Sequence, residues 1–184
     1  MLQTFQNLAK TLARVCLILT ISAPVLCNAD SETKEHSEHG ESQSPHVHGK
    51  AELHIVLDGN QLFVELHSPA MNLLGFEHDI HSSEDQKKVE NTRTRLENPN
   101  ALFLFNDGEC VPKQQSSDFS DTHSHNDIEA TYLYICEKPD SLHSAKIFLL
   151  NVFSNIASLQ VQWIIHNQQG VSTLDHQHNE INFQ

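Results

Sequence analysis

The sequence predicts a mainly β fold of the α+β class, an antiparallel β-sandwich or half-barrel with one helix on its surface. Two observations support this prediction. Six or seven short segments alternate apolar with polar residues, which is the period of a β-strand, and turn residues separate them. Only residues 82–97 have the composition and the end signals of a helix.

The clearest strand pattern is a β-hairpin within residues 45–78. Side chains alternate from Val47 to Leu57 and again from Leu62 to Leu66, on either side of a turn sequence. A two-residue Gly59–Asn60 loop fixes the register. In that register the apolar pairs are Leu57 with Leu62, Ile55 with Val64, and Leu53 with Leu66.

The polar face of this hairpin carries residue types that bind zinc or copper. The same register places His54 opposite Glu65 and Glu52 opposite His67, with facing Cβ atoms about 5 Å apart. Imidazole and carboxylate groups are both ligands for such metals. The alternative is a solvated face with two His–Glu ion pairs.

His46 and His48 form the sharpest candidate metal pair. They are two residues apart on one strand face, roughly 6–7 Å between Cα atoms, so both rings can reach one ion. Gly49 permits the close approach of another segment. The following connection is long enough to fold back, which makes Glu77 or His78 the expected further ligand. The alternative is that both histidines only continue a disordered tail.

The N-terminal region divides into two parts. Residues 1–29 have a basic start, a short apolar run and a small residue at Ala29, which is typical of a cleaved secretory signal peptide and too short to span a membrane. Residues 30–45 are polar and aperiodic, so we expect a disordered arm. Its His36 and His39, mixed with glutamates, are a compositional cue for metal capture.

Charge and length limit the classes of function. Cleavage after Ala29 leaves 155 residues, and we expect residues 46–184 to form a single domain. Without Lys10 and Arg14, 24 acidic residues face 9 basic ones, a net charge of −15. Such a chain repels nucleic acid and attracts cations. All 14 histidines lie in the mature part, about three times an ordinary share.

Cys110 and Cys136 are the two cysteines that remain after signal cleavage. An even pair in an exported chain predicts a disulfide bond, here worth roughly 3 kcal/mol by loop closure. The alternative is a thiolate metal site, which an oxidising compartment disfavours.

The rest of the chain predicts the surface helix and further strands. Ser82 or Ser83 is expected to cap the helix at 82–97, whose thin apolar stripe suits a helix lying across a sheet. Residues 113–127 are expected to form a polar loop that holds His123 and His125 beside aspartates, a second arm for cation capture. The remaining strands are expected at 101–105, 128–136, 145–153, 158–166, 171–174 and 181–183, with a turn at 167–170.

Several segments resemble the ZrgA-like family of exported zinc-binding proteins. They include HVHGKAELHIVLDGNQLFVELHSPAMNLLGFEH at 46–78, the cysteine at 110, the His-bearing acidic insert at 118–127, YLYIC at 132–136, Pro139-x-x-Leu142 and VQWIIHNQQGVSTL at 161–174. The resemblance implies a periplasmic protein that binds Zn²⁺ and assists a high-affinity zinc importer or its binding protein.

Two other classes of function compete with zinc capture or buffering. A metal-dependent hydrolase could use His46, His48 and Glu77, but the sequence has no H-E-x-x-H, G-x-S-x-G or phosphate-loop motif, so we expect no enzyme. A pH-responsive structural domain would use the histidines to offset the negative charge. Zinc is favoured over calcium because histidine is plentiful, and over Cu(I) because Met71 is the only mature methionine.

Overall fold

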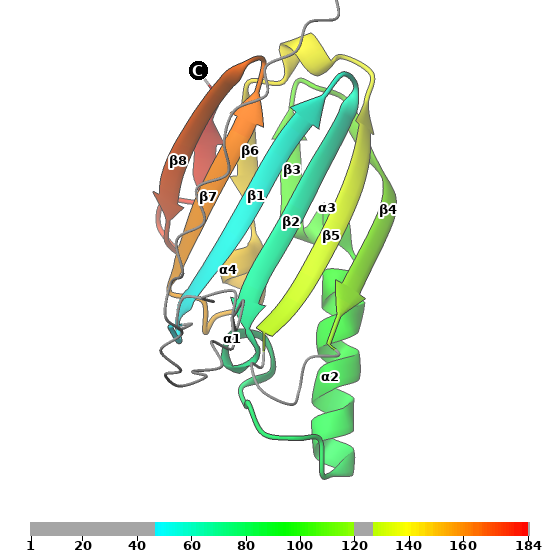
Figure 1. Cartoon of the computed structure of the whole chain (residues 1–184), viewed down its shortest axis with the longest axis vertical. Helices are drawn as coiled ribbons and strands as arrows, with labels where there is room; N and C mark the ends of the chain where they lie inside the picture. Colours follow the sequence, from blue (N-terminus) through cyan, green and yellow to red (C-terminus); the bar gives the residue numbers. More distant parts are fainter. Residues whose placement is uncertain (1–46, 120–126, 184) are drawn as a thin grey trace, which may run out of the picture. The chain divides into compact units, whose positions relative to one another are not determined.

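The described part of the chain folds into two β-sheets. A computed structural model describes residues 47–119 and 127–183, which belong to the second, Ser42–Gln184, of the two units into which the chain divides. Within these residues there are nine strands and four α-helices (Figure 1). The expected signal segment 1–29 and arm 30–45 lie outside the described residues.

The strands are β1 (Lys50–Asp58), β2 (Gln61–Pro69), β3 (Phe103–Asn106), β4 (Cys110–Asp118), β5 (Asp127–Cys136), β6 (Ser144–Ile147), β7 (Ser158–Ile165), β8 (Gln168–Leu174) and β9 (Glu180–Asn182). The helices are α1 (Ala70–Leu74), α2 (Ser83–Leu96), α3 (Pro99–Leu102) and α4 (Leu149–Val152), and a 3₁₀ turn spans Pro139–Ser141.

The predicted hairpin is the centre of the larger sheet, whose strand order is β4-β5-β2-β1-β7-β8. Its register is confirmed, because Asp58 pairs with Gln61 across the Gly59–Asn60 loop and Leu53 pairs with Leu66. β1 and β7 run parallel, whereas the other neighbours in this sheet are antiparallel. The hairpin therefore has a strand paired on each of its outer sides.

The smaller sheet, in the order β3-β6-β9, packs on the inner face of the larger one (Figure 1). Aromatic rings join the two layers: Phe103 lies 5.1 Å from Tyr132 and Phe105 lies 4.9 Å from Tyr134, between ring centroids. The inward residues of β1 and β2 are buried between the layers, except for Leu57 beside the turn, which is partly buried. Of the two predicted architectures, the sandwich is the one that forms, and the outer face of the larger sheet carries the polar side chains of the hairpin.

Helix α2 confirms the predicted helix and its cap, but it does not lie across the face of a sheet as predicted. The Ser82 hydroxyl accepts a hydrogen bond from the Asp85 amide, and the Asp85 carboxylate accepts one from the Ser82 amide, which completes a capping box. The helix packs against α1 and α3 at one end of the sheet instead of across its face. Its buried side includes Thr92, whose hydroxyl donates to the Leu73 carbonyl, so the contact is with α1.

Two apolar segments predicted as strands are half helical. Residues 99–102 form α3, with Pro99 at its first position, where a missing amide hydrogen has no consequence. The strand β3 then starts at Phe103. In 145–153 the strand ends at Ile147 and α4 follows, which lets the consecutive Leu149 and Leu150 both be buried. A strand would have turned one of them outward.

In the predicted polar loop at 113–127, residues 113–118 are strand. β4 extends to Asp118 and pairs with β5 along its length, with a bulge between Pro112 and Gln114. It is an edge strand of polar, exposed residues, so it lacks the apolar alternation on which the prediction relied. Residues 120–126, with His123 and His125, lie outside the described residues.

The turn between β7 and β8 is shorter than predicted. His166 and Asn167 both have positive φ, 52° and 61°, and they form the turn alone. Gly170 lies in β8 instead, opposite Trp163, where an added Cβ would come within 2.5 Å of the indole. This glycine serves close packing and not the turn.

Candidate metal centre

The β1–β2 ladder brings three predicted ligands together on the outer face of the larger sheet. His54 of β1 faces Glu65 of β2, and His67 follows Glu65 two residues later, on the same face. One donor atom from each residue lies within 4.8 Å of the other two. We call these three residues the outer-face triad. Glu52, which faces His67 on β1, is not a member of this group.

The outer-face triad has its carboxylate in the middle. Glu65 Oε1 lies 3.4 Å from His67 Nε2, and Glu65 Oε2 lies 3.8 Å from His54 Nδ1. The two imidazole centroids are 5.6 Å apart. The side chains are 34–44% exposed, so an ion from solvent can reach all three. The arrangement is that of a carboxylate shared by two histidines.

Glu129 is a neighbour that the sequence analysis missed. It lies on β5 opposite His67, and its Oε1 is 3.2 Å from His67 Nδ1. With the proton on Nδ1, this contact leaves the lone pair of Nε2 directed at the triad. Carboxylates commonly orient metal-binding histidines in this manner. The period-two alternation of residues 128–136 places Glu129 outward, but only the β2–β5 register reveals its partner.

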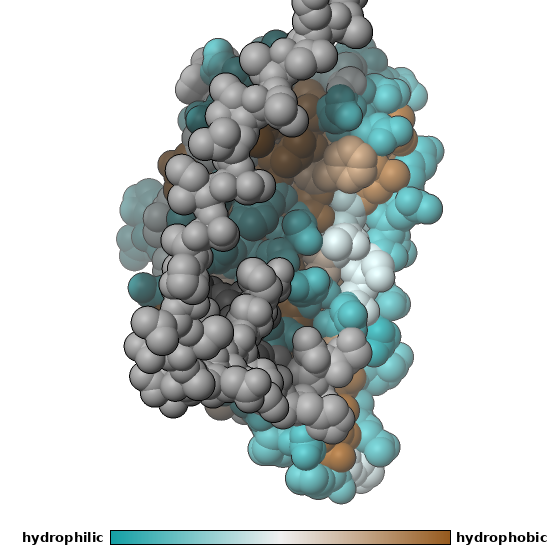
Figure 2. Space-filling view, viewed as in Figure 1, coloured by the Kyte–Doolittle hydropathy of each residue, from teal (hydrophilic) through white to brown (hydrophobic). Residues whose placement is uncertain are grey.

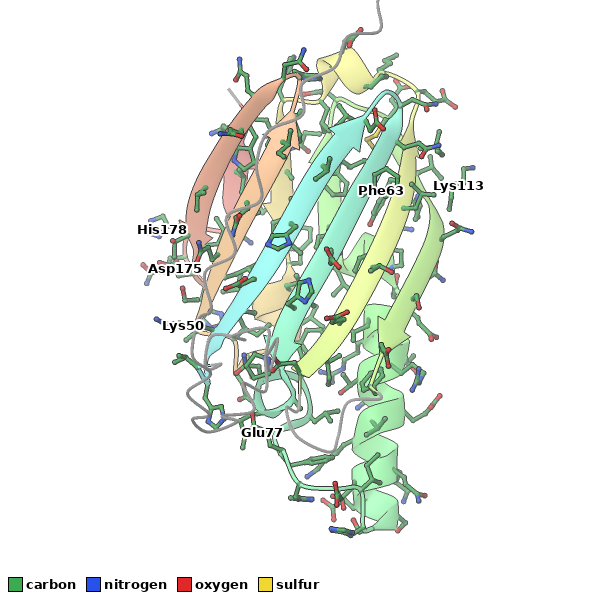
Figure 3. All side chains as sticks on the ribbon, viewed as in Figure 1. Lys50, Phe63, Glu77, Lys113, Asp175 and His178 are labelled. Carbon is green, nitrogen blue, oxygen red and sulfur yellow. A yellow bond between two sulfur atoms is a disulfide. The ribbon has the colours of Figure 1, made fainter. Side chains whose placement is uncertain are left out.

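A second pair forms at the open end of the hairpin. His48 Nε2 lies 2.9 Å from Oε2 of Glu77, which is 22% exposed. A turn from Val47 to Lys50, closed by a bond from the Lys50 amide to the Val47 carbonyl, presents His48. Helix α1 ends at Gly75, whose φ of +80° turns the chain so that Glu77 follows, as Figure 3 shows below α1.

Asn72 fixes this end of the hairpin. Its side chain is buried, accepts a hydrogen bond from the Gly49 amide at 2.7 Å, and donates to the Lys50 carbonyl at 2.7 Å. Gly49 has φ +81°, a conformation that favours glycine, and its carbonyl accepts from the Ala157 and Ser158 amides. The turn that carries His48 is therefore bonded to both α1 and the start of β7.

The other predicted ligands are placed as follows. His78 stacks on Phe76, with 4.6 Å between ring centroids, and lies 6.1 Å from the His81 ring. Its Nδ1 is 2.8 Å from the Asp79 carbonyl oxygen. A small pocket beside Glu77 and His78 is lined mainly by apolar side chains of α1, α2 and the sheet end. His36, His39 and His46 lie outside the described residues.

An additional histidine–carboxylate pair lies between β8 and β9. His178 Nδ1 is 3.1 Å from Asp175 Oδ1, and the same oxygen accepts the backbone amides of Gln177 and His178. These bonds, led by the His178 amide, hold the pKa of the Asp175 carboxyl below its ordinary range. Both side chains point away from the sheet into solvent (Figure 3). The close spacing in Asp175-His176-Gln177-His178 was the available sequence signal.

Cys110 and Cys136 are joined by a disulfide bond, as predicted, and they face each other at the end of the β4–β5 ladder. In the part of the chain that the structure describes, no helix combines the length and apolar character needed to cross a membrane.

The fold and the site define a β-sandwich protein that carries a partly exposed cluster of zinc-type ligands. A family model described as ZrgA family zinc uptake protein matches residues 45–183. The chain therefore belongs to the ZrgA family of zinc uptake proteins. No curated protein matches the chain.

Proposed function

We propose that this protein captures or buffers Zn²⁺ in the periplasm and assists its high-affinity uptake. The observation that carries the proposal is the outer-face triad, with three donor atoms within 4.8 Å on an accessible surface. Two imidazoles and a carboxylate suit zinc better than calcium or magnesium, which prefer oxygen ligands throughout. Zinc is the cargo in this proposal.

The triad needs only a small rearrangement to bind an ion. Ligand atoms of a tetrahedral zinc site lie roughly 3.3 Å apart, because each is about 2.0–2.1 Å from the metal. The spacing of up to 4.8 Å must therefore contract by about 1.5 Å, which rotation of half-exposed side chains can supply. Three protein ligands leave a fourth position open to solvent. An open position favours exchange of the ion, as a carrier requires.

We assign a second zinc position to the open end of the hairpin. His48 and Glu77 are its fixed pair, His46 is the expected third ligand, and His78 is the remaining candidate. The arm expected at 30–45 and the histidines at 123 and 125 would add weaker capture, the arm through His36 and His39. A flexible segment loses conformational entropy when it binds an ion. These histidines should therefore raise the number of bound zinc ions more than the affinity for zinc.

The location in the periplasm rests on the expected signal peptide and on the disulfide bond, which forms in oxidising compartments. The partner we propose is a zinc importer or its binding protein. Intact-mass analysis of periplasmic and cytoplasmic fractions tests the location: a periplasmic chain that begins near Asp30 supports it, and an uncleaved chain that stays in the cytoplasm contradicts it.

Zinc titration of matched variants tests the function. We expect His54→Ala/His67→Ala to weaken zinc binding at the triad at least tenfold, which is about 1.4 kcal/mol. His143→Ala is the control, because His143 is also exposed but lies on the turn before β6. Deleting residues 30–44 should reduce the number of bound ions more than the tightest affinity. If that deletion abolishes all zinc binding, the folded sites do not bind zinc.

A further inference from the structure

The two edges of the larger sheet differ in how they are protected. Its edge strands are β4 and β8 (Figure 1). β4 contains Pro112, Lys113 and a bulge between Pro112 and Gln114, which are features that discourage pairing with a further strand. Hydrophilic side chains line most of the β4 side in Figure 2. β8 has the sequence QQGVSTL, without proline, charge or bulge, so it is the edge that is open to another strand.

The outer side of β8 presents the backbone groups of three residues. Because a two-residue turn precedes β8, Ile165 and Gln168 exchange both backbone hydrogen bonds, and the bonded pairs then alternate along the β7–β8 ladder. The N–H and C=O groups of Gln169, Val171 and Thr173 therefore point away from β7. Within the described part of the chain these groups make no hydrogen bond. Val171 is 64% exposed, so a partner can reach them.

A buried indole beneath β8 lacks a hydrogen-bond acceptor. Trp163 of β7 is 7% exposed and pairs with Gly170 of β8, and its Nε1 has no acceptor among the described residues. This nitrogen lies 2.9 Å from the position that a Cβ would take on Gly170, so the ring reaches beneath the edge strand. Nearly all buried N–H groups in proteins are bonded. A residue opposite Gly170 on an added strand would bring an acceptor to this side of the sheet.

Charge indicates the kind of strand that fits this edge. The residues of β8 are uncharged, and the chain as a whole has a net charge of −13. Asp175, directly after β8, adds an exposed carboxylate. A neutral or basic segment is attracted by this field, whereas a second copy of the chain brings the same negative charge and is repelled. The occupant that fits is therefore a segment of a different protein.

We propose that β8 is a docking edge for an extended, neutral or basic segment of a partner protein, which joins the six-stranded sheet as a further strand. Main-chain hydrogen bonds to Gln169, Val171 and Thr173 supply most of the affinity, as in other cases where a peptide adds a strand to a sheet. A small polar side chain opposite Gly170 accepts the Trp163 Nε1–H and supplies specificity.

The experiment uses the full chain and the synthetic peptide acetyl-KTVTNTVTK-amide, whose central asparagine supplies the acceptor. Because backbone bonds carry the affinity, this generic strand should bind saturably. Hydrogen exchange should slow at the amides of Gln169, Val171 and Thr173 and stay unchanged along β4. Trp163 is the only tryptophan of the chain, so its fluorescence emission should change as Nε1 gains an acceptor.

Matched changes in the peptide and in the protein test the pairing. Methylation of the amides of the two threonines beside the asparagine removes donors that face β8 and should abolish binding. Leucine in place of the asparagine should weaken binding roughly fivefold, the effect of one net hydrogen bond, and reduce the change in Trp163 emission. Val171→Pro should weaken binding about tenfold or more without breaking the bonds to β7, because the Val171 amide points away from β7. Val171→Thr keeps the amide and should bind as the wild type does.

Zinc affinity should be the same in Val171→Pro, because Val171 pairs with Gln162 and Gln162 with His54, which places the docked strand three strand spacings, about 14 Å, from the triad. No saturable binding, or equal binding by wild type and Val171→Pro, overturns the proposal. Equal affinity for the asparagine and leucine peptides overturns the role given to Trp163. If light scattering finds a dimer without peptide that Val171→Pro abolishes, a second copy occupies the edge and the proposal is overturned.

Discussion

His48 Nε2 lies 2.9 Å from Glu77 Oε2, although 29 residues separate them in the chain. Neither residue is on a regular element, yet both are held by their neighbours. The Asn72 side chain bonds the turn that carries His48, and Gly75 ends the helix before Glu77. A pair that is already in contact before metal arrives loses little conformational entropy on binding, which favours it as part of a tight site.

The double change His46→Ala/His48→Ala should weaken the tight class of zinc binding at least tenfold, or about 1.4 kcal/mol. The unfolding transition of the metal-free protein should be nearly unchanged, because the His48 side chain is exposed and takes no part in the buried core. Competition with a zinc chelator measures the affinity, and His143→Ala is again the control. Unaltered tight binding would place the tight class at the outer-face triad instead.

Asn72→Ala should destabilise the protein by about 2 kcal/mol or more, since it leaves the Gly49 amide and the Lys50 carbonyl without their side-chain partner. Denaturant unfolding measures this loss. Zinc affinity at the His48–Glu77 end should fall with it, while the outer-face triad, held by the β1–β2 ladder, should keep its affinity. Asn72→Asp keeps the acceptor but loses the donor and sets a buried carboxylate oxygen against the Lys50 carbonyl, so it should be no milder. Equal losses at both sites would show that Asn72 supports the sheet in general.

The hairpin register could be predicted from sequence because period-two alternation and a two-residue turn fix each other. A slip by one residue would have placed Leu53 and Leu66 on opposite faces. Only one register therefore buries both of them. In other segments, an apolar run alone does not distinguish a strand from a helix. Leu149 and Leu150 are adjacent and both buried, which a helical turn allows and a strand with one outward face does not, and nothing in 145–153 marks where the strand ends.

The candidate site was predictable to the extent that it is local. His54 and Glu65 come together through the hairpin, so sequence was sufficient. His67 contacts Glu65 diagonally on its own strand, and Glu129 reaches it from β5, a relation that depends on the order of strands in the sheet. Glu52 shares the face but not the cluster, because side-chain direction as well as register decides which donors converge.

The disulfide bond should contribute roughly 3 kcal/mol to stability, because it closes a loop with a sequence separation of 26 residues. We expect Cys110→Ala/Cys136→Ala to lose that amount in denaturant unfolding under oxidising conditions. Under reducing conditions the wild type should approach the variant. Intact-mass analysis after alkylation should find no free thiol in protein from the periplasm. Two alkylated cysteines would show that the bond does not form there.

Stability at acid pH should depend on the cap of α2. Hydrogen bonds from the Ser82 side chain and from the Ser82 and His81 amides lower the pKa of the Asp85 carboxyl from its ordinary value of 3.8. A carboxyl whose pKa is lower in the folded state stabilises the fold fully above the unfolded value. That contribution shrinks as pH falls through 3.8 and is lost below the folded pKa.

Two variants separate the cap from its ionisation. Ser82→Ala removes the capping hydroxyl and should destabilise the protein by about 1 kcal/mol at neutral pH. Asp85→Asn removes the titrating group, so wild type and Asp85→Asn should differ in stability at pH 6, and this difference should shrink as pH falls through 3.8. Urea unfolding at several pH values measures both effects, with Glu84→Gln as a control in the same helical turn that takes no part in the capping box. A constant difference between wild type and Asp85→Asn down to pH 3 would show that the carboxylate charge does not stabilise this helix end.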